Sequence, residues 1–551
     1  MCPTTGALER GTVPGADVFQ NEDSALASLK ARGLAKTVTR SRALLGYAVF
    51  GETALALVAR RVRVAAVLPN GHEVLTVTEA KWHRAPLRDP KACLTKEERN
   101  RVASLTETPM ENLYFYCETF DVSRPFALAG DDDDDSLKKN RELTARGGDG
   151  GVIGDLQWVW NAWLSEPLRA LDIPHACPAL LQGLAESRRL TDLKGREYRV
   201  AVFGRRSSAH PGTRYNARGL NDAAAPGNEV EMEQIVWTRE RDGSDGNEEG
   251  SEATTRHARH SVEEPPSVSS AGGRDAQPRL ARDDASVSEC SVWSSYVWRR
   301  GSVPIRWRQE IKQSIGDAEI FVSDENPYRG TGQYFASLAR GYRPGDATRE
   351  DGFPVTCVNL LRCAPGKPEL LLSEHFHEAV RGVRRRAGLS GITVLNFDWH
   401  GNIKALGEAK TVEGLWNALR SHLADAGVAR GRCRTRGGAS REPETKAETL
   451  NREDVLAPSD DARSPMLAGS PSAEIPTPAI GAPFAVAPSR KVTSTYQRGV
   501  LRYNCADSLD RTNLASYFAA VQVLAEQARL LGLDVARDID AASVDAEGDA
   551  S

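Results

Sequence analysis

The chain has 551 residues, a net charge of −4 and 40% hydrophobic residues. A chain of this length is too long to fold around one ordinary hydrophobic core, so we expect two or more globular units with linkers. The charge argues against a general nucleic-acid partner, and no apolar run is long enough to cross a bilayer. The nine cysteines are odd in number and form no C-x-x-C pair, which fits a reducing compartment rather than a disulfide framework.

The first part of the chain is expected to be mostly β. Residues 1–40 form a polar segment without the apolar stretch of a signal peptide. Short Val- and Leu-rich runs with tight turns predict consecutive strands in residues 43–82, and residues 112–126 continue this pattern. Residues 155–171 predict a helix with a buried stripe of tryptophans that includes Trp163.

Two polar stretches interrupt the second part of the chain. Residues 238–289 are charged and serine-rich, and residues from about 430 to 490 are rich in Pro, Ala, Ser and Arg, so both are expected to be disordered insertions. Between them, expected strands alternate with expected helices, and this order predicts an α/β layer architecture. Its elements are a strand at 355–363, a helix at 368–388, a strand at 391–401 and a helix at 411–427.

The stretch R-Y-N-C-A-D-S-L-D-R-T-N, residues 502–513, places a cysteine among arginines and aspartates. Residues 499–504 predict a strand and residues 514–533 a helix, so Cys505 to Thr512 would be the loop between them. In an α/β sheet such loops border the ligand crevice, and the N–H groups at a helix start attract anions. The stretch therefore predicts an anion site.

Cys505 and Arg511 have the spacing C-x-x-x-x-x-R. Arg511 would bind two oxygens of a phosphate, and the positive field would lower the Cys505 pKa and make it a nucleophile. The resulting phosphocysteine would be hydrolysed by water, without a metal or cofactor. Asp507 and Asp510 would each act as a general acid or hold the loop shape. Thr512 would cap the helix or donate to the Cys505 sulfur.

This motif resembles the signature of the Sac-domain phosphoinositide phosphatases. Residues 210–236, 299–309 and 396–400 resemble further blocks of the same family. The resemblance implies an α/β fold in which a mostly β N-terminal Sac subdomain packs on a catalytic domain of the cysteine-phosphatase type. The implied division is residues 41–190 for the first part, residues 191–535 for the second and residues 536–551 for a disordered tail.

The resemblance also implies a substrate, a phosphatidylinositol phosphate in a cytoplasmic membrane leaflet. The protein would be cytoplasmic and peripheral on an endomembrane or the plasma membrane, and no protein partner is indicated. Asn504, Arg214 and Arg218 would bind the substrate together with Arg511. Similarity to the large plant-type members favours phosphatidylinositol 4,5-bisphosphate, cut at the 5-position. Those members continue with a tryptophan-rich WW module, so the chain is expected to be a truncated form or an incomplete gene model.

Two other functions stay open. The first is a protein phosphatase that uses the same cysteine–arginine spacing. Two features argue against it: the residue before Cys505 is Asn504 rather than a His, and the loop contains no glycine. The second is a catalytically inactive phosphoinositide-binding or scaffold protein, which the chain end and the long insertions suggest.

Overall fold

The computed structural model describes the larger part of the chain. The described residues are 41–50, 53–86, 95–129, 156–170, 177–212, 217–239, 290–311, 318–342, 353–386, 388–434 and 494–535, with the single positions 27 and 31. Apart from those two positions, residues 1–40 lie outside the described residues. The tail and the interior of both insertions lie outside them as well, so the expectations for these segments stay predictions.

One half of the main sheet is antiparallel, and each of its strands pairs with the next along the chain. The apolar runs that predicted strands in residues 43–82 and 112–126 form its first four members. The strands are β1 (Ala43–Phe50), β2 (Thr53–Val67), β3 (Glu73–Pro86), β4 (Tyr114–Cys117), β5 (Leu181–Thr191), β6 (Glu197–Arg206), β7 (Val230–Arg239) and β8 (Cys290–Ser302).

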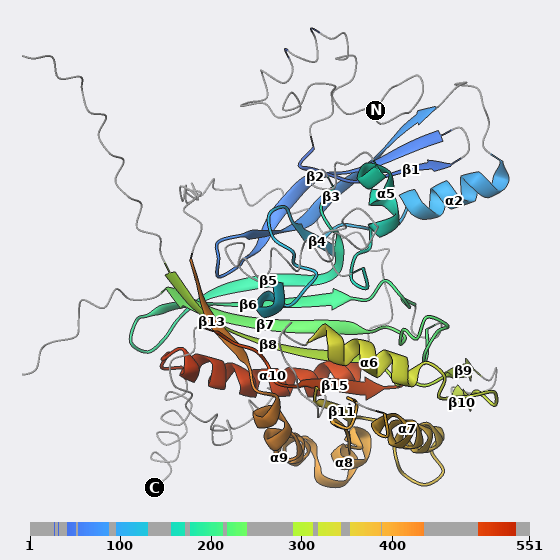
Figure 1. Ribbon diagram of the computed structural model, residues 1–551, viewed down its shortest axis with the longest axis vertical. Helices are drawn as coiled ribbons and strands as arrows, with labels where there is room; N and C mark the ends of the chain where they lie inside the picture. Colours follow the sequence, from blue (N-terminus) through green and yellow to red (C-terminus); the bar gives the residue numbers. More distant parts are fainter. Residues whose placement is uncertain are drawn as a thin grey trace, which may run out of the picture.

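The other half of the sheet is parallel. Strand β15 (Val500–Cys505) lies between β8 and β11 (Val355–Asn359), and β12 (Ile392–Asn396) follows β11. Strand β13 (Ala429–Arg434) pairs with the first half of β8 and with the short β14 (Ser494–Thr495). In Figure 1 the sheet runs without a break from the blue N-terminal strands through the green ones to β15.

Helices flank the sheet, and five of those in the described residues follow β10 in the chain. They are α2 (Lys96–Thr106), α3 (Phe126–Ala129), α5 (Ala162–Ala170), α6 (Thr331–Gly341), α7 (Pro368–Arg384), α8 (Trp399–Leu406), α9 (Glu408–Ala426) and α10 (Asp510–Leu530). Strands β9 (Trp307–Ile311) and β10 (Ala318–Val322) form a separate hairpin.

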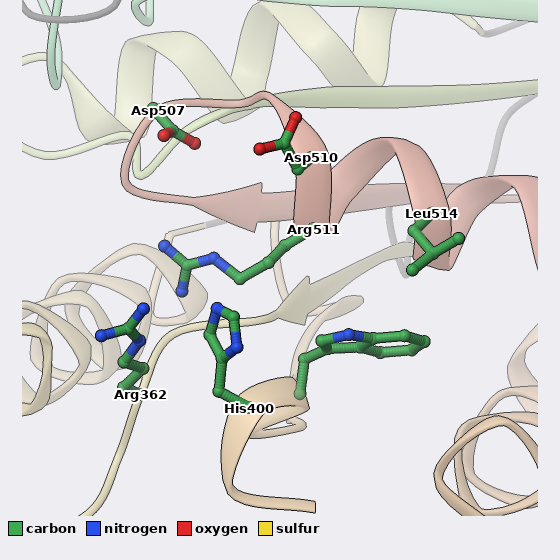
Figure 2. A pocket seen from close by; sticks show the side chains of 7 residues that line it. Arg362, His400, Asp507, Asp510, Arg511 and Leu514 are labelled. Atoms are coloured by element: carbon green, nitrogen blue, oxygen red, sulfur yellow. The ribbon is translucent and has the colours of Figure 1, made fainter. Parts of the chain in front are cut away.

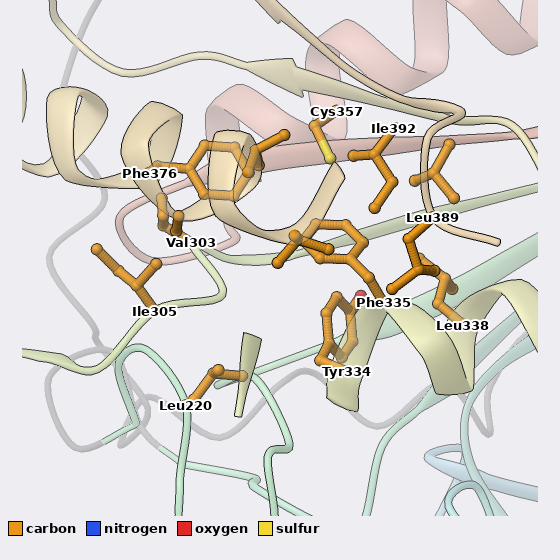
Figure 3. Close-up of a cluster of buried hydrophobic side chains, with 14 of the residues drawn as sticks. Leu220, Val303, Ile305, Tyr334, Phe335, Leu338, Cys357, Phe376, Leu389 and Ile392 are labelled. Atoms are coloured by element: carbon orange, nitrogen blue, oxygen red, sulfur yellow. The ribbon is translucent and has the colours of Figure 1, made fainter. Parts of the chain in front are cut away.

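Two apolar clusters join the parallel strands to these helices, one on each face. On one face Phe335 of α6 and Phe376 of α7 pack with Cys357 and Ile392 of the sheet (Figure 3). On the other face α9 and α10 pack against β11 and β15, with Tyr503 among the fully buried side chains. The expected α/β architecture is thus confirmed as a mixed sheet with helices on both faces of its parallel half.

The expected subdomain boundary falls inside this continuous sheet. Residue 190 lies near the end of β5, and β5 pairs along its length with β6, which belongs to the other expected part. The division of the chain into residues 41–190 and 191–535 stays a prediction.

A row of charged residues crosses four neighbouring strands. The register pairs Arg205 of β6 with Glu231 of β7, Glu231 with Arg299 of β8, and Arg299 with Arg502 of β15. Paired positions point to the same face of a sheet, so these side chains form one line. The two Glu231 oxygens lie 3.1 Å from Arg205 Nη1 and 3.2 Å from Arg299 Nη2.

Two more glutamates complete this charged row. Glu233 accepts a hydrogen bond from Arg205, and Glu229 lies 3.7 Å from Arg299 and 3.6 Å from Arg502. All six side chains are buried, so three guanidinium groups face three carboxylates without access to water. Removing buried ions from water is costly, and the row is tolerable only because every charge has partners.

The helix expected at residues 155–171 begins only at Ala162. The preceding residues form turns, and Val159 among them forms a β-bridge with Leu181. Asn161 stabilises this course, because its side chain accepts from the Leu180 N–H and donates to the Leu45 carbonyl, both at 2.9 Å. The predicted tryptophan stripe is therefore wrong for Trp163, whose side chain is exposed.

Other element boundaries also differ from the expectation. Residues 238–239 end β7 and residues 430–434 belong to β13, so these edges of the two insertions are strands. Pairing with β8 explains both, because β8 forms hydrogen bonds with both strands. The strand expected at 391–401 ends at Asn396, since Asp398 caps α8 by accepting from the Gly401 N–H at 2.8 Å.

The charged row predicts a large stability effect. Glu231→Gln should lower the free energy of unfolding by about 3–5 kcal/mol, because two buried guanidinium groups lose a charged partner. Urea denaturation of the full chain measures this loss. Glu186→Gln, in an exposed ion pair with Arg188, is the matched control and should cost less than about 1 kcal/mol. Equal unfolding midpoints for the two variants would contradict this reading of the row.

Candidate active site

A crevice opens where the parallel strands end. Strands β11 and β15 are neighbours, but α7 after β11 packs on one face of the sheet and α10 after β15 packs on the other. Loops that diverge in this way leave a ligand site at the carboxyl ends of the strands. A pocket of about 200 Å³ lies there (Figure 2). Its lining residues are Arg362, Trp399, His400, Asp507, Asp510, Arg511 and Leu514.

The Cys505 loop is shorter than the sequence predicted. Cys505 is the last residue of β15, and α10 begins at Asp510 with Leu509 as its N-cap, so only residues 506–509 are irregular. Ser508 has φ of 59°, a left-handed conformation that is uncommon for serine. The chain turns back at this residue, and the Ser508 N–H donates to the Cys505 sulfur at 3.0 Å.

The thiol of Cys505 is buried and protonated at neutral pH. Its Sγ donates to Asp507 Oδ1 at 3.2 Å. The pKa of Cys505 is raised to about 11, because burial and the Asp507 carboxylate together outweigh the opposing charge of Arg511. The predicted lowering of this pKa is wrong for the loop as it stands. The sequence revealed the positive groups, but not the burial of the sulfur or its contact with Asp507.

Arg511 is held at one end of its guanidinium group. Nη1 and Nη2 donate to the two Glu369 carboxylate oxygens at 2.7 and 2.9 Å, and Nη1 also donates to the Leu360 carbonyl at 2.9 Å. Of the five N–H groups, the Nε–H and one Nη2–H have no acceptor among the described residues. These two lie along one edge of the plane and form a fork that fits two phosphate oxygens.

Sequence reasoning missed Glu369, which positions this fork. Glu369 lies in the first turn of α7, where an acidic residue is common for reasons of helix stability alone. Its partner Arg511 is 142 residues away in the chain, so no local pattern links the two.

Arg300 is a second arginine at the loop that the sequence did not single out. The register places Arg300 of β8 beside Tyr503 of β15, and its Nη1 donates to the Ser508 carbonyl at 2.7 Å. Burial lowers the Arg300 pKa to about 10, so the group stays cationic at neutral pH. Arg300 therefore holds the loop at Ser508 and adds positive charge near Cys505.

The remaining loop residues separate by position. Asp507 is half-buried at the Cys505 sulfur, and Asp510 is exposed on the pocket wall. The Thr512 hydroxyl donates to the Leu509 carbonyl at 3.0 Å, within the first turn of α10. Neither role expected for Thr512 is found, because Leu509 occupies the N-cap position and the hydroxyl has a different acceptor.

Two other predicted substrate ligands, Asn504 and Arg218, do not line the pocket. Asn504 precedes Cys505 on a strand, so its side chain points to the opposite face and accepts from Arg502. Arg218 is buried and donates to Gln309 Oε1 at 3.0 Å. Arg214 lies outside the described residues. His400, in contrast, is exposed at the pocket.

Comparison with known proteins identifies the family. Residues 42–404 match the SacI homology domain. The chain belongs to the SacI homology domain family. Cys505 lies beyond the matched range, so the assignment of its role rests on the geometry of the loop.

Curated relatives of this chain carry the names of phosphoinositide phosphatases. The chain is 25% identical over 540 residues to phosphatidylinositol-3-phosphatase SAC1 of Arabidopsis thaliana, across 93% of this chain and 50% of that protein. It is 23% identical over 519 residues to the polyphosphoinositide phosphatase of Schizosaccharomyces pombe, across 93% and 47%. The chain thus spans about half the length of these relatives. Within the described residues, no helix has the length and apolar character needed to cross a membrane.

The contact between Asp507 and Cys505 predicts how the thiol titrates. Asp507→Asn should move the midpoint of Cys505 alkylation to lower pH, because the variant removes a negative charge that raises the thiol pKa. The measurement is the rate of iodoacetamide modification of the Cys505 peptide across a pH series, read by mass spectrometry. Asp510→Asn is the control and should leave the midpoint in place. Identical midpoints for wild type and Asp507→Asn would exclude this electrostatic contact.

Proposed function

We propose that this chain is a phosphoinositide phosphatase that removes a ring phosphate through a phosphocysteine at Cys505. The observation that carries the proposal is the free fork of Arg511, fixed by Glu369 in a pocket that the Cys505 loop borders. The family and the names of its relatives support a phosphoinositide as substrate. The lipid would lie in a cytoplasmic leaflet, with the protein bound peripherally.

The hydrogen bond between Cys505 and Asp507 suggests the first chemical step. As a phosphate binds the Arg511 fork, the thiol proton passes to the Asp507 carboxylate, which leaves a thiolate and a carboxylic acid. The sulfur then attacks phosphorus, and Asp507 returns the proton to the departing inositol oxygen. In the second step Asp507 removes a proton from water, which attacks the phosphocysteine and releases inorganic phosphate.

The most detailed question in the proposal is which ring phosphate the enzyme removes. The resemblance favoured the 5-position of phosphatidylinositol 4,5-bisphosphate, whereas the name of the Arabidopsis SAC1 relative specifies the 3-position. The proposal therefore covers ring phosphates of phosphatidylinositol as a class. Product analysis with 3-, 4- and 5-phosphorylated lipids distinguishes the positions.

One observation favours a second candidate, a phosphoinositide-binding protein without activity. Cys505 is fully buried, and Asp507 rather than Cys505 lines the pocket. In the catalytic proposal, substrate binding has to break the contact between these residues. In the alternative the contact persists while the lipid is bound.

Cys505→Ser should abolish phosphate release while lipid binding remains. Serine has nearly the same shape, but its hydroxyl is a far weaker nucleophile than a thiolate. Release from a panel of phosphoinositides can be measured by the malachite-green method, with vesicle binding as the control for folding. Release by the serine variant at the wild-type rate would exclude the cysteine mechanism. Binding without release by the wild type would favour the inactive alternative.

The two loop aspartates should differ by substrate. Asp507→Asn should slow an inositol lipid by roughly 10²-fold or more, because an alkoxide leaves poorly without a proton. The comparison is made on kcat/KM, which reports the steps up to loss of the leaving group and not the later attack of water. kcat/KM for an aryl phosphate should fall much less, since a phenolate leaves unaided. Asp510→Asn serves as the comparison and should affect the two substrates alike. Equal slowing of both substrates by Asp507→Asn would exclude Asp507 as the proton donor.

A further inference from the structure

We propose that Arg362 binds a second phosphate of the substrate, beside the phosphate bound by Arg511. The inference rests on the proposed function and makes Arg362 a specificity-determining residue. Its expected ligand is a phosphate monoester on the same inositol ring, so the preferred substrates would be doubly phosphorylated phosphoinositides.

The backbone around Arg362 is fixed relative to the Cys505 strand and to Arg511. The Leu360 N–H donates to the Asn504 carbonyl at 2.9 Å, and the Leu360 carbonyl accepts from Arg511. The Arg362 N–H donates to the same Glu369 oxygen that accepts from Arg511, at 2.7 Å. One carboxylate therefore sets the spacing between Arg362 and the Arg511 fork.

A second carboxylate holds the other side of this segment. The Cys363 N–H donates to Asp398 Oδ2 at 2.9 Å, and Asp398 also caps α8, which carries His400. Arg362 thus lies between two anchored peptide groups. Its position is built into the pocket wall and does not depend on a free loop.

The side chain of Arg362 is directed into the pocket and has no counter-ion in the described part of the chain. Figure 2 shows its guanidinium group facing Arg511 and His400. Arg511 already has Glu369 as its partner, whereas Arg362 is exposed. Glu369 and Asp398 accept from backbone N–H groups of this segment, so the Arg362 guanidinium group faces the pocket without a carboxylate partner of its own in the described residues and can bind a second phosphate.

His400 and the aspartates define the two ends of the pocket. Desolvation, together with the charges of Arg362 and Arg511, lowers the pKa of His400. Its imidazole is therefore uncharged at neutral pH, and the positive charge at this end of the pocket belongs to the two arginines. Asp507 and Asp510 lie on the other side of Arg511 from Arg362 (Figure 2). A ring with two phosphates can therefore place the scissile group near Cys505 and the other group at Arg362, away from both carboxylates.

The experiment compares singly and doubly phosphorylated short-chain phosphoinositides. Arg362→Gln should lower kcat/KM for the 3,5- and 4,5-bisphosphates by about 10-fold or more, mainly through KM, because a charge-assisted contact is lost. The 3- and 4-monophosphates should change less than about 3-fold. Arg420→Gln removes an exposed arginine from α9 as a matched control and should change neither class.

Each outcome decides the inference. An equal loss for both classes would assign Arg362 to the phosphodiester that all these lipids share, and no loss for either would exclude it as a ligand. Calorimetric titration of the same lipids into the Cys505→Ser chain, with and without Arg362→Gln, gives the result without turnover. A selective loss of bisphosphate affinity there supports the second site even where the wild type releases no phosphate.

Discussion

The buried row of Arg205, Glu231, Arg299 and Arg502 fixes the register of the strands on which the site depends. A slip of one residue between two strands would turn a buried charge to the other face and leave its partner unpaired. The pairings of β6, β7, β8 and β15 are therefore specified by charge as well as by apolar packing. The antiparallel half of the sheet and the strand that carries Cys505 are parts of one electrostatic unit.

Alternation along the strands connects this row to the chemistry. Arg299 faces the row, and the next residue, Arg300, faces the opposite side and binds the loop at Ser508. On β15, Arg502 faces the row and Cys505, three residues later, faces the side of α10. One face of the central strands thus provides stability, while the other places the sulfur and its neighbours.

Periodicity predicted the elements where apolar packing alone decides them. The helices expected at 368–388 and 411–427 and the strand expected at 499–504 are confirmed as α7, α9 and β15. Apolar periodicity does not account for every position of α10, because Tyr517 is exposed and Gln527 is buried. The Gln527 amide donates to backbone carbonyls of β7 and β8, an interaction that hydrophobic patterning cannot indicate.

Of the site itself, only the residues that are close together in the sequence could be predicted. The motif located Cys505, Asp507 and Arg511, since they follow one strand and begin one helix. Glu369, Arg362 and Arg300 come from other parts of the chain, and only the fold brings them to the loop. The raised pKa of Cys505 has the same origin, because burial is a property of the folded chain.

The most direct test of the account is to identify the residue that carries phosphate during turnover. A single turnover of a phosphoinositide, quenched in acid within its first half-life and digested, should place phosphate on the peptide that contains Cys505. The phosphorylated fraction should rise and then fall as inorganic phosphate appears. Phosphate on another peptide, or release of inorganic phosphate with no phosphorylated peptide at any quench time, would contradict the cysteine mechanism.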